Sequence, residues 1–224
     1  SASVHNVTFG GRSLVEDLPV MVSILSESLQ RPVFPEDQVE KLRARLLTGI
    51  AMREDDTAEM ASLSFDQLLF QNHPYGKPED GFTETILKIT REDLIKFHKQ
   101  QYGPMGMVIV AVGAVEPRAV INLVEQYFSG WQNSQQAEPP LVSPISKPGN
   151  TVRKHITLQG KSQADIVMGS IGPQRSSEDY LPASLGNNIL GRFGMMGRIG
   201  DVVREQSGLA YHASTSLNAW VAAG

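Results

Sequence analysis

A stretch rich in Pro, Ser and Gln divides this 224-residue chain into two patterned regions. Residues 132–150 have no apolar periodicity, which is typical of a linker, and we assign 139–150 to the linker itself. Because a linker does not contribute to a hydrophobic core, each flanking region must find its own packing. We therefore expect two structural parts, residues 1–138 and residues 151–224.

Apolar spacing predicts both helices and strands in these regions. Apolar side chains three or four residues apart indicate several helices; their ranges are about 17–29, 36–53, 57–70, 117–128, 177–190 and 201–206, and a further helix follows a Thr90 cap. Alternating or continuous apolar runs indicate strands; their ranges are 4–9, 107–112, 152–158, 164–171 and 209–217. This order predicts an α+β fold with helices packed on a mostly antiparallel sheet.

Composition narrows the classes of function. The formal net charge is -4 and no basic block occurs, which argues against nucleic acid as the partner. Cysteine is absent, which removes disulfides, thiolate metal sites and a cysteine nucleophile. No apolar run reaches the roughly 18 residues that a membrane span needs. The first residues do not resemble a signal peptide, and both ends look cut from a longer protein. We expect a soluble protein, cytoplasmic or periplasmic.

The residues that could hold a metal or act as a nucleophile are scattered. No histidine lies three or four residues from another, so no pair has the spacing of zinc ligands. The chain has five histidines, which are His5, His73, His98, His155 and His212. No Gly-x-Ser-x-Gly elbow occurs. The acidic run 54–56 is typical of a solvated helix end.

Two further candidate functional features lie near the C-terminal end. Glycine recurs every third residue, at Gly191, Gly194, Gly197 and Gly200, but without the spacing of a phosphate-binding loop, which favours a flexible or close-packed backbone loop. Further on, a short helix presents Arg204, Gly208 ends it, and Tyr211 follows in a predicted strand. Such a pair can hydrogen-bond a peptide carbonyl or carboxylate, and a purely structural contact is the alternative.

Residues 198–211 resemble the glycine-rich loop and the Arg…Gly-Leu-Ala-Tyr segment of the insulinase/pitrilysin zinc peptidases, which include the mitochondrial processing peptidases. Earlier segments follow the order of the same family, so the resemblance covers nearly the whole chain; these segments are 31–36, 52–56, 73–76, 89–94, 102–104 and 110–115. The resemblance implies repeated α+β modules that are paired around a chamber. Residues 1–138 would be the later two-thirds of a degenerate module, and 151–224 the opening third of the next.

The resemblance also implies that this part of the family carries no zinc. Catalytic modules have a His-x-x-Glu-His motif and a distal glutamate as the third zinc ligand. The motif is absent here, and Gly49 stands where the distal glutamate is expected. We therefore expect no cofactor in this chain, no catalysis by the chain alone, and zinc in a partner half.

The same resemblance implies roles for individual residues. Arg204 and Tyr211 match the pair that contacts the substrate backbone, with Gly194 and Gly197 in a loop that contacts substrate. The expected function is to help form the chamber and bind extended peptide for a zinc-bearing half. One alternative is a non-catalytic scaffold subunit, as in respiratory complexes; another, an active zinc peptidase, lacks visible ligands. Unpaired strand edges also predict a homo-oligomer through exchanged strands.

Overall fold

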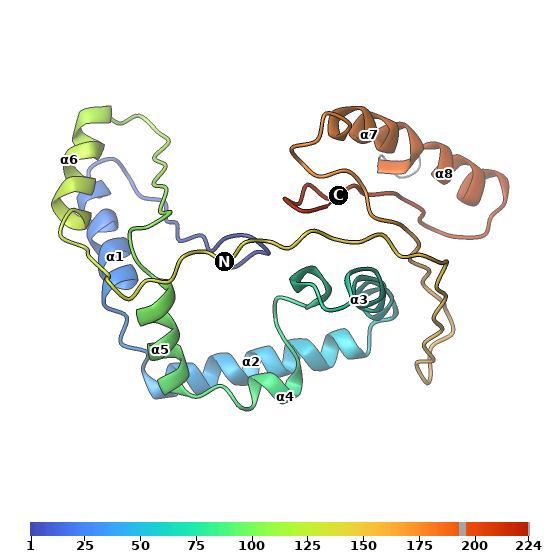
Figure 1. The fold of residues 1–224 in the computed structure, drawn as a ribbon, viewed down its shortest axis with the longest axis horizontal. Helices are drawn as coiled ribbons and strands as arrows, with labels where there is room; N and C mark the ends of the chain where they lie inside the picture. Colours follow the sequence, from blue (N-terminus) through green and yellow to red (C-terminus); the bar gives the residue numbers. More distant parts are fainter. Residues whose placement is uncertain (193–195, 224) are drawn as a thin grey trace. The chain divides into compact units, whose positions relative to one another are not determined.

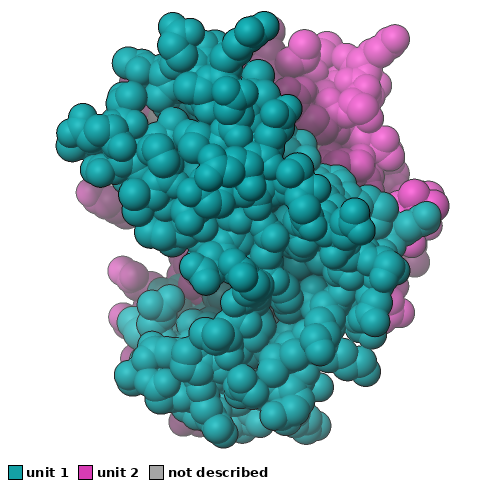
Figure 2. Space-filling view, turned by 90° about the vertical axis from the view of Figure 1, so that its left-hand side faces the viewer, with its two compact units in different colours: residues 1–56, 78–140 teal, residues 57–77, 141–224 magenta. Residues whose placement is uncertain are grey.

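A computed structural model describes residues 1–192 and 196–223 (Figure 1). The chain divides into two compact units, coloured separately in Figure 2. Unit 1 contains residues 1–56 and 78–140, and unit 2 contains residues 57–77 and 141–224. The division into modules at 1–138 and 151–224 stays a prediction, because spatial contacts do not reveal which residues descend from one repeat.

Unit 1 is built from helices joined by open chain. They are α1 (Leu18–Gln30), α2 (Glu36–Glu54), α4 (Thr83–Ile86), α5 (Arg91–Gln101) and α6 (Pro117–Phe128). Helices α1 and α6 pack against each other. Ser26 and Gln30 lie one turn apart on α1 and donate to the Tyr127 carbonyl, at 3.0 Å and 2.8 Å. These bonds satisfy a carbonyl at the C-terminal end of α6, where no helical partner remains.

Two arginines hold the connections of unit 1. Arg91 donates to the carbonyls of Phe34 at 2.7 Å and Val33 at 3.0 Å. Arg43 donates to the carbonyls of Ile86 and Ile89. A guanidinium has several donors in one plane, so a single side chain can fix two successive peptide groups. The connections after α1 and after α4 are thereby attached to α5 and α2.

Unit 2 also consists of helices and open chain. Its helical segments are α3 (Thr57–Phe70), η1 (Pro74–Gly76), α7 (Tyr180–Asn187), η2 (Asn188–Arg192), α8 (Arg198–Gly200) and η4 (Asp201–Gln206). Its core gathers Phe70, Tyr75 and Ala223, with Trp220 packed against them. Tyr75 meets Phe70 edge to face at 5.6 Å and Trp220 at 4.4 Å, distances typical of favourable aromatic pairs.

His73 fixes the turn at the centre of that core. Its Nδ1 accepts from the Tyr75 N–H at 3.2 Å, so Nε2 carries the proton and donates to the Ser143 carbonyl at 3.1 Å. The Tyr75 hydroxyl in turn accepts from the Ala222 N–H at 3.1 Å. The His-Pro-Tyr-Gly turn therefore joins α3 to two segments distant in sequence.

The predicted sheet is wrong. Within the described residues, the β-bridges are limited to one isolated pair, Ala2 with Val7. The segments predicted as strands, at 4–9, 107–112, 152–158, 164–171 and 209–217, run otherwise as open chain. A strand satisfies its backbone only by pairing with a neighbour, whereas apolar alternation shows only which face a neighbour would cover. Here most of those apolar side chains stay exposed, as Val112 at 94% shows. Helices joined by open chain replace the expected α+β layers.

The exposed surface is large for the mass of the chain. It measures 16824 Å². A compact monomer of this mass would expose about 10,000 Å², and two separate compact bodies with the sizes of the two units about 12,000 Å². The buried apolar residues in the described chain are few; they are Val22, Ile50, Phe70, Tyr75, Phe128 and Ala223. The units by themselves therefore bury less surface than independent domains of their size.

Among the described helices, none has both the length and the apolar character needed to cross a membrane.

The start of α5 confirms the Thr90 cap. Thr90 Oγ1 accepts from the Asp93 N–H at 3.1 Å, and an Asp93 carboxylate oxygen accepts from the Thr90 N–H at 2.9 Å. The same oxygen accepts from the Thr90 hydroxyl at 2.9 Å. The backbone bond, followed by the hydroxyl bond, lowers the pKa of Asp93 from its ordinary value of 3.8.

We expect Asp93→Asn to lower the free energy of unfolding at neutral pH. Because the folded pKa is lowered, the ionised carboxylate stabilises α5 above the unfolded value of 3.8, and this contribution is lost as pH falls through the lower folded pKa. Urea unfolding from neutral pH to below 3.8 should show the two proteins converging. Glu92→Gln, in the same helical turn but without the Thr90 bonds, is the control. A difference that stays constant with pH would contradict this origin.

Candidate functional site

The position of Arg204 follows from the end of η4, a π-helical segment. Gly208 ends it in the left-handed region, at φ 61°. That conformation strains most side chains but not glycine. The Gly208 N–H donates to the Arg204 carbonyl at 3.0 Å, and the Leu209 N–H donates to the Val203 carbonyl at 3.0 Å. The chain then reverses and carries Tyr211 back toward Arg204.

The structure brings Arg204 and Tyr211 together. Arg204 Cζ lies 4.8 Å from the centroid of the Tyr211 ring, a distance at which a cation–π interaction operates. Arg204 Nε also lies 3.4 Å from Glu205 Oε1. The Arg204 side chain is 30% exposed and Tyr211 is 86% exposed. The pair is therefore assembled within unit 2 and reachable from solvent.

This arrangement fits hydrogen bonding to a polypeptide. A guanidinium stacked on a ring uses its face, and its N–H donors point outward in the plane. A phenol hydroxyl can both donate and accept. Unit 2 also contains a second stacked pair, with Arg175 Cζ 4.6 Å from the Tyr180 ring centroid. Geometry alone therefore does not separate a binding pair from a structural one.

The glycine-rich segment is closely packed. Gly197 is buried, and a Cβ added there would lie 2.5 Å from Gly191 Cα and 3.0 Å from the Leu190 carbonyl oxygen. Gly191 in turn faces Thr215, whose N–H donates to the Gly191 carbonyl at 3.2 Å. This agrees with the close-packed interpretation of the glycine spacing. A contact between Gly197 and substrate stays a prediction, and Gly194 lies outside the described residues.

The described residues do not fit a zinc site. No group of three or more His, Asp and Glu side chains able to hold a metal occurs among them. His73 and His98 bond to backbone carbonyls, those of Ser143 at 3.1 Å and Leu29 at 2.7 Å. Gly49 lies in α2, and a Cβ added there would meet nothing within 4 Å. The place expected for a third ligand is thus a helix surface open to solvent.

A groove in unit 2 was not anticipated from the sequence. It has a volume of about 1310 Å³ and lies between α3 and residues 147–171. Its lining includes Arg153, Lys154 and the buried Ser64. In the sequence, the signal for this groove was the pair of adjacent basic residues at 153 and 154 within an alternating apolar run.

Comparison with known proteins identifies the family. Residues 88–222 match the family described as peptidase M16 inactive domain. An uncharacterized zinc protease of Streptomyces coelicolor is 29% identical over 206 residues, which cover 89% of this chain and 44% of that protein. Subunit 1 of the mitochondrial cytochrome b-c1 complex of Bos taurus is 27% identical over 186 residues, covering 81% of this chain and 38% of that protein.

A solved structure supports the same fold. The peptidase M16 inactive domain from Pseudomonas fluorescens matches with a TM-score of 0.78 at 24% identity, covering 92% of this chain and 49% of that chain. The chain belongs to the peptidase M16 inactive domain family, which confirms the insulinase-type resemblance. It spans about half the length of the relatives it matches. The substrate roles of Arg204, Tyr211, Gly194 and Gly197 stay predictions.

We expect Gly197→Ala to lower the free energy of unfolding by about 1–3 kcal/mol, because the new methyl group overlaps backbone atoms that cannot move independently. Gly186→Ala is the matched control, since a Cβ there meets nothing within 4 Å and the residue lies in α7. The control should be neutral or more stable by about 0.5–1 kcal/mol. Urea unfolding measures both. Equal stabilities would show that residue 197 is not closely packed in solution.

Proposed function

We propose that this chain is a non-catalytic part of an M16-type peptidase, which helps to enclose a chamber and binds extended peptide for a zinc-bearing half. The observation that carries the proposal is the stacked, solvent-accessible pair of Arg204 and Tyr211. Membership of a family described as inactive supports the absence of catalysis by the chain alone. The similarity to an uncharacterized zinc protease of Streptomyces coelicolor supports the link to zinc peptidases.

In this proposal Arg204 donates to a carbonyl of the bound peptide. Tyr211 adds a second hydrogen bond, or donates to the oxyanion that forms when water attacks the scissile carbonyl. Zinc, held by the other half, supplies Lewis acidity and an activated water. Arg204 and Tyr211 would orient the peptide without touching the metal. Gly194 and Gly197 belong to the proposed substrate-contacting loop, where Gly197 acts by letting the backbone pack closely.

The location of Arg204 in a π-helical segment supports a binding role. Such segments are rare and occur often at functional sites, because they cost stability relative to an α-helix. The proposal keeps residues 1–138 as the later part of one module and 151–224 as the opening of the next. A zinc-bearing half or subunit is then the required partner.

A scaffold role is the second candidate, because cytochrome b-c1 complex subunit 1 of Bos taurus matches 81% of this chain. A scaffold must present surfaces for assembly but has no need to bind free peptide. Fluorescence anisotropy with a labelled extended peptide separates the two, since saturable binding that Arg204→Ala weakens excludes a pure scaffold.

We expect Arg204→Ala to lower peptidase kcat/KM about 10²-fold, and Tyr211→Phe about tenfold, when the corresponding full-length protein is assayed with its zinc-bearing half. The larger loss at Arg204 follows from its charge and its several donors. Arg175→Ala is the matched control, because it removes a stacked arginine of similar geometry, 4.6 Å from the Tyr180 ring. Unchanged activity in both site variants would remove the catalytic-support role, and an equal loss in the control would assign the effect to structure.

A second copy of the chain is a further proposed partner. The large exposed surface would favour self-association through exchanged segments. Sedimentation of the isolated chain over a range of concentrations should show a dimer or larger species. A monomer at every concentration would exclude this partner without affecting the peptide-binding proposal.

A further inference from the structure

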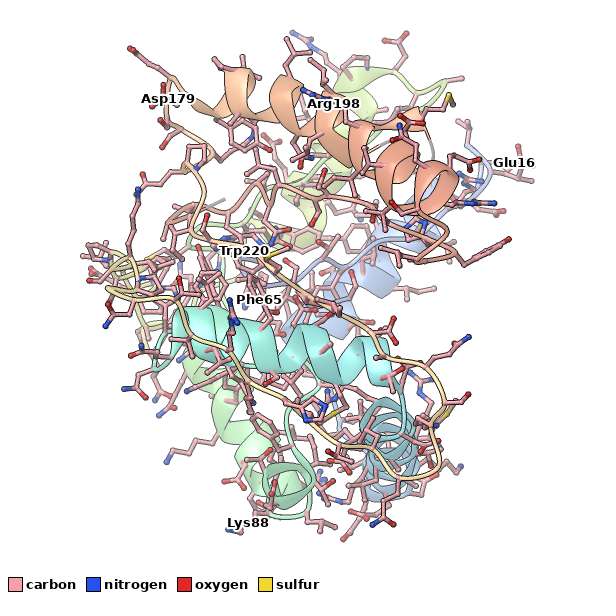
Figure 3. All side chains as sticks on the ribbon, turned by 90° about the vertical axis from the view of Figure 1, so that its right-hand side faces the viewer. Glu16, Phe65, Lys88, Asp179, Arg198 and Trp220 are labelled. Atoms are coloured by element: carbon pink, nitrogen blue, oxygen red, sulfur yellow. The ribbon has the colours of Figure 1, made fainter. Side chains whose placement is uncertain are left out.

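We propose that the groove between α3 and residues 147–171, called here the α3 groove, binds an extended polypeptide segment that carries acidic side chains. The groove lies wholly within unit 2. Its volume of about 1310 Å³ exceeds the range of about 300–1,000 Å³ typical of small-molecule pockets, so a polymer fits it better. Figure 3 shows the open chain passing across α3, on which Phe65 is labelled.

The floor of the α3 groove is apolar. Met60, Phe65 and Leu68 of α3 line it. Phe65 approaches the opposite wall closely, because a Cβ added at Gly169 would lie 2.9 Å from Phe65 Cζ. The wall carries further apolar side chains that remain exposed, including Met168 at 89%. Alternate side chains of an extended segment would cover this surface and gain the corresponding burial.

The walls also offer hydrogen bonds. Within the described chain, no backbone–backbone hydrogen bond occurs at the peptide groups of residues 151–157 and 163–171. An extended polypeptide pairs with such groups through its main chain, as in β-strand addition. The Ser64 hydroxyl lines the same groove, is only 6% exposed, and has no partner among the described residues. A buried hydroxyl without a partner is unfavourable, and a ligand carbonyl would satisfy it.

Charge selects the class of polypeptide. The lining includes four basic side chains, Lys147, Arg153, Lys154 and Lys161, and one carboxylate, that of Asp165. Asp165 already accepts from the Thr57 hydroxyl at 2.5 Å. Unit 2 has 9 basic and 7 acidic residues, whereas unit 1 has 11 and 17, so the formal charges are +2 and -6. An acidic ligand is therefore complementary to the groove within an otherwise acidic chain.

This site is independent of the proposed function at Arg204 and Tyr211, since neither residue lines the α3 groove. Backbone pairing and the apolar floor favour a polypeptide over other polyanions, because a nucleic acid would leave Phe65 and the peptide groups without complementary contacts. The occupant is thus an extended segment that alternates apolar and acidic side chains.

The experiment measures fluorescence anisotropy of a labelled peptide of alternating valine and glutamate added to the full chain. We expect saturable binding that weakens at high ionic strength, and about a tenfold or greater rise in Kd in the double variant Arg153→Glu, Lys154→Glu. Both substituted residues are exposed, so folding should be preserved, which circular dichroism checks. Ser64→Ala should raise Kd by a smaller factor because it removes one hydrogen bond.

One variant and two peptides serve as controls. Lys88→Glu with Lys96→Glu makes the same charge change on exposed residues of unit 1 and should leave Kd unchanged. A peptide of alternating valine and lysine, and a valine–glutamate peptide methylated on its backbone nitrogens, should both bind at least about tenfold more weakly. Equal binding of the lysine peptide, no effect of the groove variant, or a chain dimer that only the groove variant dissociates would each overturn the proposal.

Discussion

Backbone hydrogen bonding is the constraint on which the rest of this structure depends. A helix pairs its own peptide groups, so α2 and α3 can form with little help from the remainder of the chain. A strand forms its backbone hydrogen bonds with a neighbouring strand. The segments at 152–158 and 164–171 have no strand partner among the described residues. The result is a set of well-formed helices joined by open chain, with an exposed area of 16824 Å². The peptide groups of these two segments therefore keep capacity to bond a partner.

Local patterns predicted the helices well, because their causes are local. The cap at Thr90 and Asp93 joins residues three apart, and in the His73–Gly76 turn the Tyr75 N–H donates to the His73 ring two residues before it. Contacts between distant segments could not be predicted in this way. The bonds from Ser26 and Gln30 to the Tyr127 carbonyl span about a hundred residues, and no periodicity encodes them. Apolar alternation did not predict strand pairing for the same reason. It indicates which face of a segment would be buried but not which neighbouring segment would bury it.

For the candidate site, the sequence and the structure contributed different information. The sequence identified Arg204 and Tyr211 through a family resemblance, and the structure shows that the two are stacked. Yet Arg175 and Tyr180 stack equally well without any motif. Spatial proximity therefore establishes that the pair can act together, whereas its sequence context is what distinguishes it. For the glycines the structure decides between two interpretations that the spacing left open. A Cβ added at Gly197 would lie 2.5 Å from Gly191 Cα, which favours close packing.

The two proposed binding features of unit 2 differ in what they would recognise. Arg204 and Tyr211 present one cation and one phenol, which suit a single peptide group of any sequence. The α3 groove presents several cations and a longer apolar floor, so it would discriminate by side-chain charge along an extended segment. A peptide held by both features would gain affinity from backbone contacts and selectivity from charge. The charge contacts weaken with salt more than the backbone contacts, because salt screens the attraction between two exposed charges more than a hydrogen bond to a neutral peptide group. Salt dependence therefore separates the two contributions without any substitution in the chain.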